Sequence, residues 1–314
     1  MTKKVLLIDT VHKIISDKLR KYGFELVKGE NLSRKEILVC IGDYCGIVIR
    51  SRIIIDKEFI DKADNLRFVA RVGSGMESID TEYCSKKNIK CLNSPEGNRD
   101  AVGEHATGML LNLLNNLNKA DSEVKSGIWK REENRGKELN TKTVAIIGYG
   151  NMGSSFAKKL SGFGCKVISY DKYKKDYEDS YTIETNLQTV FDEADILSLH
   201  VPLTEETKYM VNSTFISSFK KSFVLINTSR GPVVKTEDLV KSLKSGKILA
   251  AALDVIEYEG SSFETTNLMI ENADFKYLAS CDNVILSPHI AGWTIESKIK
   301  LAEILANKII NLNL

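Results

Sequence analysis

Three glycines stand two and then three residues apart in the stretch Gly148-Tyr149-Gly150-Asn151-Met152-Gly153. The apolar run Val144 to Ile147 precedes them and is typical of a buried strand, while a helical pattern begins at Asn151. Gly148 would permit a tight turn, Gly150 would leave room for a phosphate, and Gly153 would let helix and strand pack closely. The first amides of the helix would then face a diphosphate. The stretch therefore predicts a dinucleotide-binding turn.

An acidic residue stands where such a site needs one. Asp171 follows Gly153 by 18 residues, at the end of the next apolar run, where its carboxylate would accept the ribose hydroxyls. A carboxylate there would repel a 2′-phosphate, so NAD is favoured over NADP as the cofactor. Three basic residues follow it, and we interpret them as solvated surface charge: Lys172, Lys174 and Lys175.

Hydride transfer between a nicotinamide and a carbonyl needs a group that protonates the developing alkoxide, and histidine suits this role. The chain has four histidines. His200 and His289 follow predicted strands, at the sheet edge where ligands of α/β proteins bind. His12 and His105 lie in predicted helices, and we expect both to be structural or to face solvent.

The elements that must position these residues form two series of strands that alternate with helices, which is typical of an α/β fold. The first series has strands at residues 5–8, 46–49 and 68–70, with helices near 11–22 and 56–63. The second has strands at residues 144–147, 167–170, 196–199, 224–227, 250–253 and 284–286. Apolar residues recur at helical spacing in 99–117, a buried or interface helix, and in 294–312.

The length of 314 residues predicts two domains. We expect residues 1–98 with 293–314 to form the substrate domain and residues 99–292 to form the NAD-binding domain, with the last helix crossing back to the first. The net charge of +2 gives no support to a nucleic-acid or membrane partner. The N-terminus becomes charged too quickly for a signal peptide, so a cytoplasmic protein is expected. The six cysteines show no metal-ligand spacing, and we expect reduced thiols and no metal.

Six motifs follow one another along the chain: Arg71-Val72-Gly73-Ser74-Gly75-Met76-Glu77-Ser78-Ile79-Asp80, the Gly148 to Gly153 turn, His200-Val201-Pro202-Leu203-Thr204, Asn227-Thr228-Ser229-Arg230-Gly231, Leu253-Asp254-Val255 and Ser287-Pro288-His289-Ile290-Ala291-Gly292. In this order and spacing they resemble the D-isomer-specific 2-hydroxyacid dehydrogenase family over nearly all of the chain. The resemblance implies two Rossmann-like domains, one flavodoxin-like and one doubly wound and NAD-binding. It also implies an active site in the cleft between them, with domain closure that excludes water.

The resemblance makes Arg230 the cation that binds the substrate's carboxylate and carbonyl, His289 the general acid and base, and Glu259 the partner of His289. The residue types suit these roles, because a carboxylate favours a protonated imidazole and a guanidinium matches a carboxylate. Glu259 keeps a five-residue offset from Asp254, and Glu257 is the alternative partner. The family usually has proline where this chain has Gly260.

The resemblance further implies contacts to NAD. Thr228 and Asp254 would meet the nicotinamide side, and Val201 with its neighbours would line the adenosine side. The remaining predicted cofactor contacts are Ser74, His200, Pro202, Ser229, Arg230, His289 and Gly292. Ser74 and Gly75 would also offer backbone amides to the substrate carboxylate.

Within the family, the chain most resembles the branch that acts on D-3-phosphoglycerate, a reaction of serine biosynthesis. The similarity lies in Ile49-Arg50-Ser51-Arg52, in the Arg71 to Asp80 stretch and in Asn93-Ser94-Pro95-Glu96-Gly97-Asn98. Arg50 and Ser51, with Arg52 as a further candidate, would bind the distal phosphate. Alternatively, these arginines only balance nearby acids. Reduction of glyoxylate or hydroxypyruvate, or broad 2-oxo acid reduction, are the alternative activities.

A function of another class is an NAD(H)-sensing scaffold, since the family includes transcriptional corepressors. The expected partner is otherwise a small 2-hydroxy or 2-oxo acid. We also expect a homodimer through the NAD-binding domain, because the apolar helix at residues 99–117 has more apolar surface than one small domain readily buries.

Overall fold

The computed structural model describes residues 3–259 and 271–314, so Gly260 lies outside the described residues. The chain divides into two compact units. The first unit comprises Met1–Asn98 and Trp293–Leu314, and the second unit comprises Arg99–Gly292.

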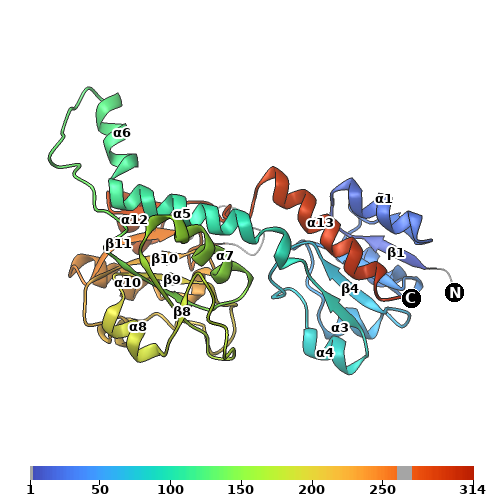
Figure 1. Ribbon diagram of the computed structural model, residues 1–314. Coiled ribbons are helices and arrows are strands. Elements are labelled where there is room, and N and C mark those ends of the chain that lie inside the picture. The colour runs from blue at the N-terminus through green and yellow to red at the C-terminus, as the bar shows by residue number, and fades with distance from the viewer. Residues whose placement is uncertain (1–2, 260–270) are drawn as a thin grey trace. The chain divides into compact units, whose positions relative to one another are not determined.

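The first unit is built on a parallel five-stranded sheet in the order β2-β1-β3-β4-β5, a flavodoxin-like order (Figure 1). The strands are β1 (Lys4–Leu7), β2 (Glu25–Lys28), β3 (Gly46–Ile49), β4 (Phe68–Arg71) and β5 (Lys90–Leu92). The helices are α1 (Lys13–Lys21), α2 (Arg34–Cys40), α3 (Lys57–Asp61), α4 (Thr81–Lys86) and α13 (Ile295–Ile310), with short 3-10 turns η1 (Ile41–Asp43) and η2 (Pro95–Gly97).

Helices cover both faces of this sheet. On one face, α1 and α13 pack together and bury Leu19 and Leu305 in the same apolar cluster. On the other face, α2, α3 and α4 bury Ile37, Phe59 and Cys84. Helix α13 begins at a capping box, in which the side chains of Thr294 and Ser297 each accept the other's backbone N–H. The C-terminal helix therefore belongs to the first unit.

The second unit is built on a parallel seven-stranded sheet in the order β12-β11-β10-β9-β6-β7-β8. Counted from β6, this is the doubly wound order of a Rossmann fold with a seventh strand at one edge. The strands are β6 (Thr143–Ile147), β7 (Lys166–Tyr170), β8 (Ile183–Glu184), β9 (Ile196–Leu199), β10 (Phe223–Asn227), β11 (Ile248–Leu253) and β12 (Val284–Leu286). The predicted α/β fold, flavodoxin-like in one unit and doubly wound in the other, is confirmed.

Helices also cover both faces of the second sheet. Phe156 of α7 and Leu110 of α5 pack on one face, and Val190 of α8 and Leu239 of α10 pack on the other. The helices among the described residues of this unit are α5 (Arg99–Asn115), α6 (Leu117–Lys125), α7 (Asn151–Leu160), α8 (Leu187–Glu193), α9 (Ser213–Ser217), α10 (Thr236–Lys244) and α12 (Ala273–Ser280), with 3-10 turns η3 (Ser161–Phe163) and η4 (Gly231–Val233).

The predicted helix over residues 99–117 is shorter in the structure. It ends at Asn115, because Asn116 has a left-handed backbone with φ of +53°, and a separate helix, α6, begins at Leu117. Helix α6 and the segment that follows it project from the second unit, and we call residues 117–135 the arm (Figure 1). The sequence did not predict α6.

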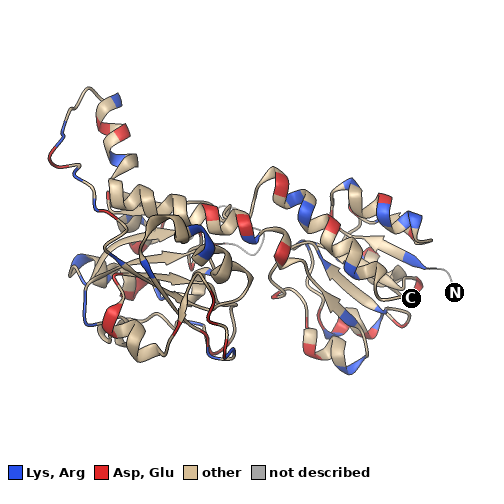
Figure 2. Ribbon diagram, in the orientation of Figure 1, with Lys and Arg blue, Asp and Glu red and all other residues tan. Residues whose placement is uncertain are grey.

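Charged residues of both signs are interspersed over the elements of each unit (Figure 2). On α13, for example, Glu296 and Glu303 alternate with Lys298 and Lys308. Among the described residues, none of the helices has the length and apolar character needed to cross a membrane.

Candidate active site

The glycine turn joins β6 to α7 and has no room for side chains at two of its three glycines. Gly148 has φ of +93°, and a β-carbon on it would lie 2.5 Å from the carbonyl oxygen of His200. A β-carbon on Gly153 would lie 2.1 Å from the Gly148 carbonyl oxygen. A β-carbon on Gly150 would meet nothing within 4 Å. The turn therefore needs glycine at both ends and is open in the middle.

Helix α7 begins with backbone donors that the described residues do not use. Asn151, Met152 and Gly153 donate no backbone hydrogen bond to any described residue, whereas Ser154 donates to the Gly150 carbonyl at 3.1 Å. These amides lie at the positive end of the helix dipole, where an anion is favoured. The open space at Gly150 lies beside them.

Asp171 lies at the carboxyl end of β7, next to the glycine turn. Its Oδ2 accepts the Tyr149 N–H at 2.9 Å, and its Oδ1 accepts the N–H groups of Tyr173 and Lys174, each at 3.0 Å. Burial raises the pKa of this carboxyl, but the three backbone hydrogen bonds outweigh burial and lower the pKa below its usual value. Asp171 is therefore ionised.

Two of the three lysines after Asp171 have partners in the structure. Lys172 pairs with Glu206, and Lys174 donates to the Tyr149 carbonyl oxygen at 2.8 Å. Lys175 is exposed.

His200 follows β9 and is held inside the unit. Its Nε2 lies 2.8 Å from the Ser198 hydroxyl, and its Nδ1 is buried without a partner among the described residues. Burial lowers its pKa to about 3, so the ring is neutral near pH 7 and does not serve as a proton donor there. Val201 packs against the core, and the Pro202 carbonyl accepts the Thr207 hydroxyl at 2.6 Å.

Arg230 lies in the loop after β10, which buried Asn227 holds in place. The Asn227 Oδ1 accepts both the N–H and the hydroxyl of Ser229, and its Nδ2 donates to the Arg230 carbonyl at 3.0 Å. The Arg230 Nη1 donates to the Ser229 carbonyl at 2.6 Å. In the same loop the Thr228 hydroxyl is buried and has no partner among the residues that the structure describes.

The structure brings His289 and Glu259 together. His289 Nδ1 lies 3.0 Å from Glu259 Oε2, and the side chains are 22% and 20% exposed, so the pair is reachable from solvent. The Glu257 carboxylate has other partners, because it accepts the Tyr209 hydroxyl at 2.6 Å and the Thr236 N–H at 3.0 Å. Glu259, not Glu257, is the carboxylate that contacts this histidine.

Asp254, at the end of β11, holds the loop that carries His289. Its buried carboxylate accepts the Ser287 hydroxyl at 2.6 Å, the Ile290 N–H at 2.9 Å and the Ala291 N–H at 2.8 Å. The family resemblance implies that Asp254 meets the nicotinamide side of NAD, and this contact stays a prediction. The observed contacts make it an anchor for the loop that continues to Gly292.

His105 of α5 makes contacts that the sequence did not predict. Its Nε2 lies 3.0 Å from the Ser287 hydroxyl and 3.5 Å from Asp254 Oδ1. It therefore ties α5 to the loop between β12 and His289. His12 is the N-cap of α1, where its side chain accepts the Ile14 N–H at 3.4 Å.

The predicted phosphate ligands lie in the first unit. The Arg50 guanidinium stacks on the Trp293 ring at 4.7 Å, and none of the described carboxylates pairs with it. Arg52 is different, because its guanidinium donates to the carbonyls of Ile8, Gly29 and Leu32 and to Asp9. These bonds occupy the Arg52 guanidinium on the surface of the unit, so Arg50 is the stronger candidate for the phosphate ligand.

Ser74 and Gly75 lie in the loop after β4, with Ser51 in the neighbouring loop after β3. The Ser74 hydroxyl donates to Asn98 Oδ1, and the Ser74 carbonyl accepts Asn93 Nδ2, each at 2.7 Å. Arg71 donates to the carbonyls of Arg50 and Gly75 and so joins the two loops.

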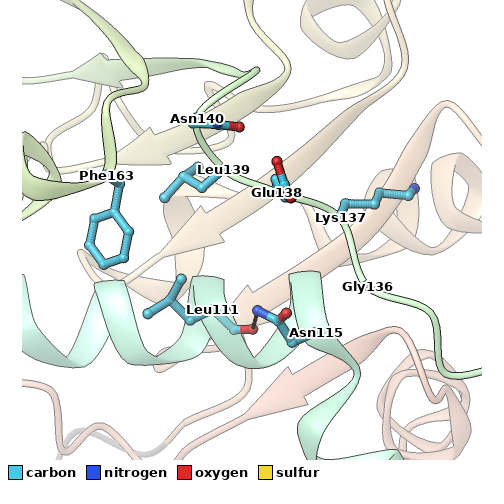
Figure 3. Close-up of a pocket in the computed structure, with 8 residues that line it drawn as sticks. All are labelled: Leu111, Asn115, Gly136, Lys137, Glu138, Leu139, Asn140 and Phe163. Carbon is cyan, nitrogen blue, oxygen red and sulfur yellow. Dashed lines mark hydrogen bonds between the residues drawn. The ribbon is translucent and has the colours of Figure 1, made fainter.

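A cavity of about 550 Å³ lies in the second unit, away from all of these residues (Figure 3). It is lined by Leu111, Asn115, Gly136, Lys137, Glu138, Leu139, Asn140 and Phe163. It therefore lies at the foot of the arm. The described residues contain no cluster of side chains suited to a metal ion.

A family model described as "D-isomer specific 2-hydroxyacid dehydrogenase, NAD binding domain" matches residues 107–291. Hydroxypyruvate reductase of Thermotoga maritima is 36% identical over 284 residues, which are 90% of this chain and 89% of that protein. D-3-phosphoglycerate dehydrogenase of Archaeoglobus fulgidus is 32% identical over 311 residues. The match covers 98% of this chain but only 57% of that enzyme.

The fold is similar to that of a D-lactate dehydrogenase from Aquifex aeolicus, solved in complex with NAD and lactic acid. The TM-score is 0.83 at 28% sequence identity, and the match covers 99% of this chain and 95% of the other.

Proposed function

The chain belongs to the D-isomer-specific 2-hydroxyacid dehydrogenase family and is an NAD-dependent oxidoreductase, and from this we propose that it interconverts D-3-phosphoglycerate and 3-phosphohydroxypyruvate. The contact between His289 and Glu259 is the observation that best supports an acid–base-assisted hydride transfer. An imidazole held by a carboxylate can donate a proton during reduction and accept one during oxidation.

The residues present fit a bound dinucleotide. The open space at Gly150 and the first amides of α7, which donate to none of the described residues, are positions that a ligand would fill. The buried Thr228 hydroxyl likewise has no partner among the described residues. Asp171 would accept the ribose hydroxyls, since each of its oxygens can accept more than one hydrogen bond. NAD, when bound, supplies or accepts the hydride.

The remaining chemistry is that of the protein. Because Nδ1 of His289 contacts Glu259, the opposite nitrogen, Nε2, exchanges the proton with the substrate oxygen. The Glu259 carboxylate holds the ring in place through Nδ1. Arg230 binds the substrate carboxylate and polarises the carbonyl, with its loop fixed by Asn227. Asp254 keeps the His289 loop in place.

The choice of a phosphorylated substrate rests on Arg50. The Arg50 guanidinium lies over the Trp293 ring and pairs with none of the described carboxylates, so its fork of donors can match a phosphate. The substrates of the alternative activities, glyoxylate and hydroxypyruvate, carry a single carboxylate and offer no second anion for this group. The hydroxypyruvate reductase relative keeps that reduction as the second candidate.

A spectrophotometric panel tests the assignment. Phosphohydroxypyruvate, hydroxypyruvate, glyoxylate and 2-oxoglutarate are each assayed with NADH and with NADPH. We expect the highest kcat/KM for phosphohydroxypyruvate with NADH. Arg50→Gln should raise KM for phosphohydroxypyruvate by about tenfold or more and leave KM for hydroxypyruvate unchanged, because a charge-assisted bond contributes ~1.5–3 kcal/mol. Arg20→Gln, at an exposed position of α1, is the charge-matched control.

Three outcomes would change this assignment. A preference for hydroxypyruvate, unaffected by Arg50→Gln, would support the reductase. NADH binding without turnover of any 2-oxo acid would indicate a dinucleotide sensor. Loss of activity in the Arg20→Gln control as well would remove the argument from Arg50.

We further propose that two copies associate through the second unit. Much of the apolar face of α5 is already buried within its own unit, including Ala106, Leu110 and Leu114. The arm carries a group of exposed apolar residues: Leu117, Val124, Ile128 and Trp129, the last 82% exposed. Apolar side chains on a projecting segment favour a protein contact.

Sedimentation equilibrium measures this association directly. We expect a dimer at micromolar concentration and a shift toward monomer in Trp129→Ser, since a buried tryptophan is often the main contributor to an interface. Tyr22→Ser, at an exposed aromatic residue of the first unit, should leave the dimer intact. A monomeric unmodified chain would rule the proposal out.

A further inference from the structure

The glycine turn contains one large side chain, that of Tyr149, which stands between the first two glycines and is only 3% exposed. Tyr149 belongs to the same apolar cluster as Phe156 of α7. Its ring stacks on the Tyr177 ring, with the two centroids 5.1 Å apart. Tyr177 lies in the segment that joins β7 to β8, residues 171–182, which we call the β7–β8 loop. Tyr149 therefore packs the glycine turn against this loop.

Three polar groups of Tyr149 bind three points of the β7–β8 loop. Its backbone N–H donates to Asp171 Oδ2 at 2.9 Å, at the start of the loop. Its carbonyl accepts Lys174 Nζ at 2.8 Å. Its hydroxyl donates to Asp179 Oδ2 at 2.8 Å, near the end of the loop. One residue thus joins the start, middle and end of the loop to the glycine turn.

The far part of the loop offers the Tyr149 hydroxyl a fixed partner. The other oxygen of Asp179, Oδ1, accepts the Tyr181 N–H at 2.8 Å, and the Tyr177 hydroxyl donates to the Ser169 carbonyl of β7 at 2.9 Å. Burial raises the pKa of the Tyr149 phenol, and the hydrogen bond to Asp179 raises it further. The hydroxyl therefore stays protonated and is the donor in this bond.

We propose that Tyr149 is a positioning residue for Asp171, and that its bond to Asp179 helps to set the preference of the protein for NAD over NADP. A carboxylate discriminates between the two only where its oxygens face the ribose hydroxyls. Asp171 uses part of its acceptor capacity on the Tyr149 N–H, so the glycine turn and the β7–β8 loop together fix the direction of the remaining lone pairs. The inference rests on the proposed role of Asp171 in binding the ribose.

Loss of the hydroxyl bond has a consequence for each dinucleotide. Without the bond to Asp179, the β7–β8 loop is held to the turn at fewer points, and the Asp171 carboxylate is less well oriented. The attraction for the ribose hydroxyls then weakens, and so does the repulsion of a 2′-phosphate. The affinity for NADH falls more than the affinity for NADPH, and the preference between them is reduced.

Fluorescence titration of the full-length protein with NADH and with NADPH tests the proposal. Tyr149→Phe keeps the ring and removes only the hydroxyl. We expect Kd for NADH to rise about three- to tenfold, because misorientation loses part of a charge-assisted hydrogen bond, with a smaller change for NADPH. Tyr209→Phe is the matched control, since it removes a phenol–carboxylate bond of the same kind, to Glu257 at 2.6 Å, and should change neither Kd.

A double-mutant cycle separates positioning from a merely structural role. Asp171→Ala removes the carboxylate and should abolish most of the preference for NADH. In that background Tyr149→Phe should change the ratio of the two Kd values no further, because there is no carboxylate left to orient. Asp179→Ala, at an exposed position, removes the acceptor instead of the donor and should shift the ratio as Tyr149→Phe does.

An unchanged ratio of the two Kd values in both Tyr149→Phe and Asp179→Ala would overturn the proposal. An equal effect of Tyr149→Phe with and without Asp171 would overturn it as well, since the tyrosine would then act independently of the carboxylate. If Asp171→Ala kept the full preference for NADH, the ribose-binding role of Asp171 and this inference would both be wrong. None of these readouts needs turnover. A protein with the expected binding pattern that reduces no 2-oxo acid would contradict the proposed reaction and leave this inference in place.

Discussion

His289 and Asp254 are joined through the backbone: the His289 N–H donates to the Asp254 carbonyl at 2.8 Å. At this point His289 has φ of +54°, in the left-handed region that residues with a β-carbon rarely adopt. Such a conformation persists only where the surroundings hold it, and such residues cluster at functional sites. The loop therefore keeps the His289 ring against Glu259.

The first prediction concerns Glu259. In Glu259→Gln the side chain keeps its size but loses the negative charge beside His289 Nδ1. We expect kcat to fall on the order of 10- to 100-fold, because hydrogen bonds to charged groups contribute ~1.5–3 kcal/mol. The affinity for NADH, measured by fluorescence titration, should stay the same, since Glu259 is not among the predicted cofactor contacts.

Glu257→Gln is the matched control for this prediction. Its carboxylate accepts the Tyr209 hydroxyl and the Thr236 N–H rather than the imidazole. The variant should lose stability while kcat is retained. If both variants lowered kcat equally, the pairing of His289 with Glu259 would not be the source of the effect.

The second prediction concerns Asp254. An amide at this position has one acceptor oxygen, so Asp254→Asn cannot accept the Ile290 and Ala291 N–H groups with separate oxygens. We expect the free energy of unfolding in urea to fall by about 1–3 kcal/mol. We also expect kcat to fall, because the His289 loop loses its anchor. Unchanged stability would show that the loop does not depend on this carboxylate.

The central strands of both sheets and the edge strand β12 were predictable from the sequence, whereas the edge strands β2, β5 and β8 were not. Central parallel strands such as β6 and β10 are buried on both faces, so they are continuous apolar runs. β2 begins with Glu25 and ends with Lys28, as edge strands often do, and β8 has only two residues. The break between α5 and α6 at Asn116 could not be predicted either, because the helical spacing of apolar residues continues to Leu117.

The candidate residues of the site followed from strand ends, from spacing and from the family resemblance, which also paired Glu259 with His289. The other interaction partners could not be predicted. Glu259 could be placed by its offset from Asp254. The contact of His105 with Ser287, 182 residues away, depends on how α5 packs on the sheet, which no local pattern encodes. Arg52 looked like Arg50 in the sequence. Only the packing of the first unit shows that carbonyl groups surround Arg52 and an aromatic ring lies against Arg50.

The third prediction concerns the glycine turn. In Gly153→Ala, the new methyl group would meet the Gly148 carbonyl oxygen at 2.1 Å, a contact that backbone atoms cannot relieve without moving. We expect this variant to unfold at a lower temperature and to bind NADH more weakly. Overpacking of this kind typically lowers stability by about 1–3 kcal/mol. Differential scanning fluorimetry and NADH titration measure the two effects.

Gly162→Ala provides the control, because a β-carbon there would meet nothing within 4 Å. Gly162 lies in η3, close after α7, so both substitutions add one methyl group to the same part of the second unit. Thermal stability and NADH affinity should match those of the unmodified protein. Equal losses in the two variants would contradict a specific role for the close contact at Gly153.

The fourth prediction is a pH dependence that arises from His200. Burial lowers the pKa of this ring from 6.5 to about 3 in the folded protein. The unfolded chain therefore binds a proton that the folded chain does not, wherever the pH lies between these values. Stability that depends on neutral His200 is complete above about pH 6.5 and declines as the pH falls toward 3.

Urea unfolding at a series of pH values from 7.5 to about 5 measures this decline. The informative quantity is the difference between the unmodified protein and His200→Gln, which has no imidazole at this position. We expect the variant to be less stable at pH 7.5, because it disturbs the contact with Ser198, but to lose less stability on acidification. Parallel pH curves for the two proteins would mean that His200 is already protonated, or accessible to protons, in the folded state.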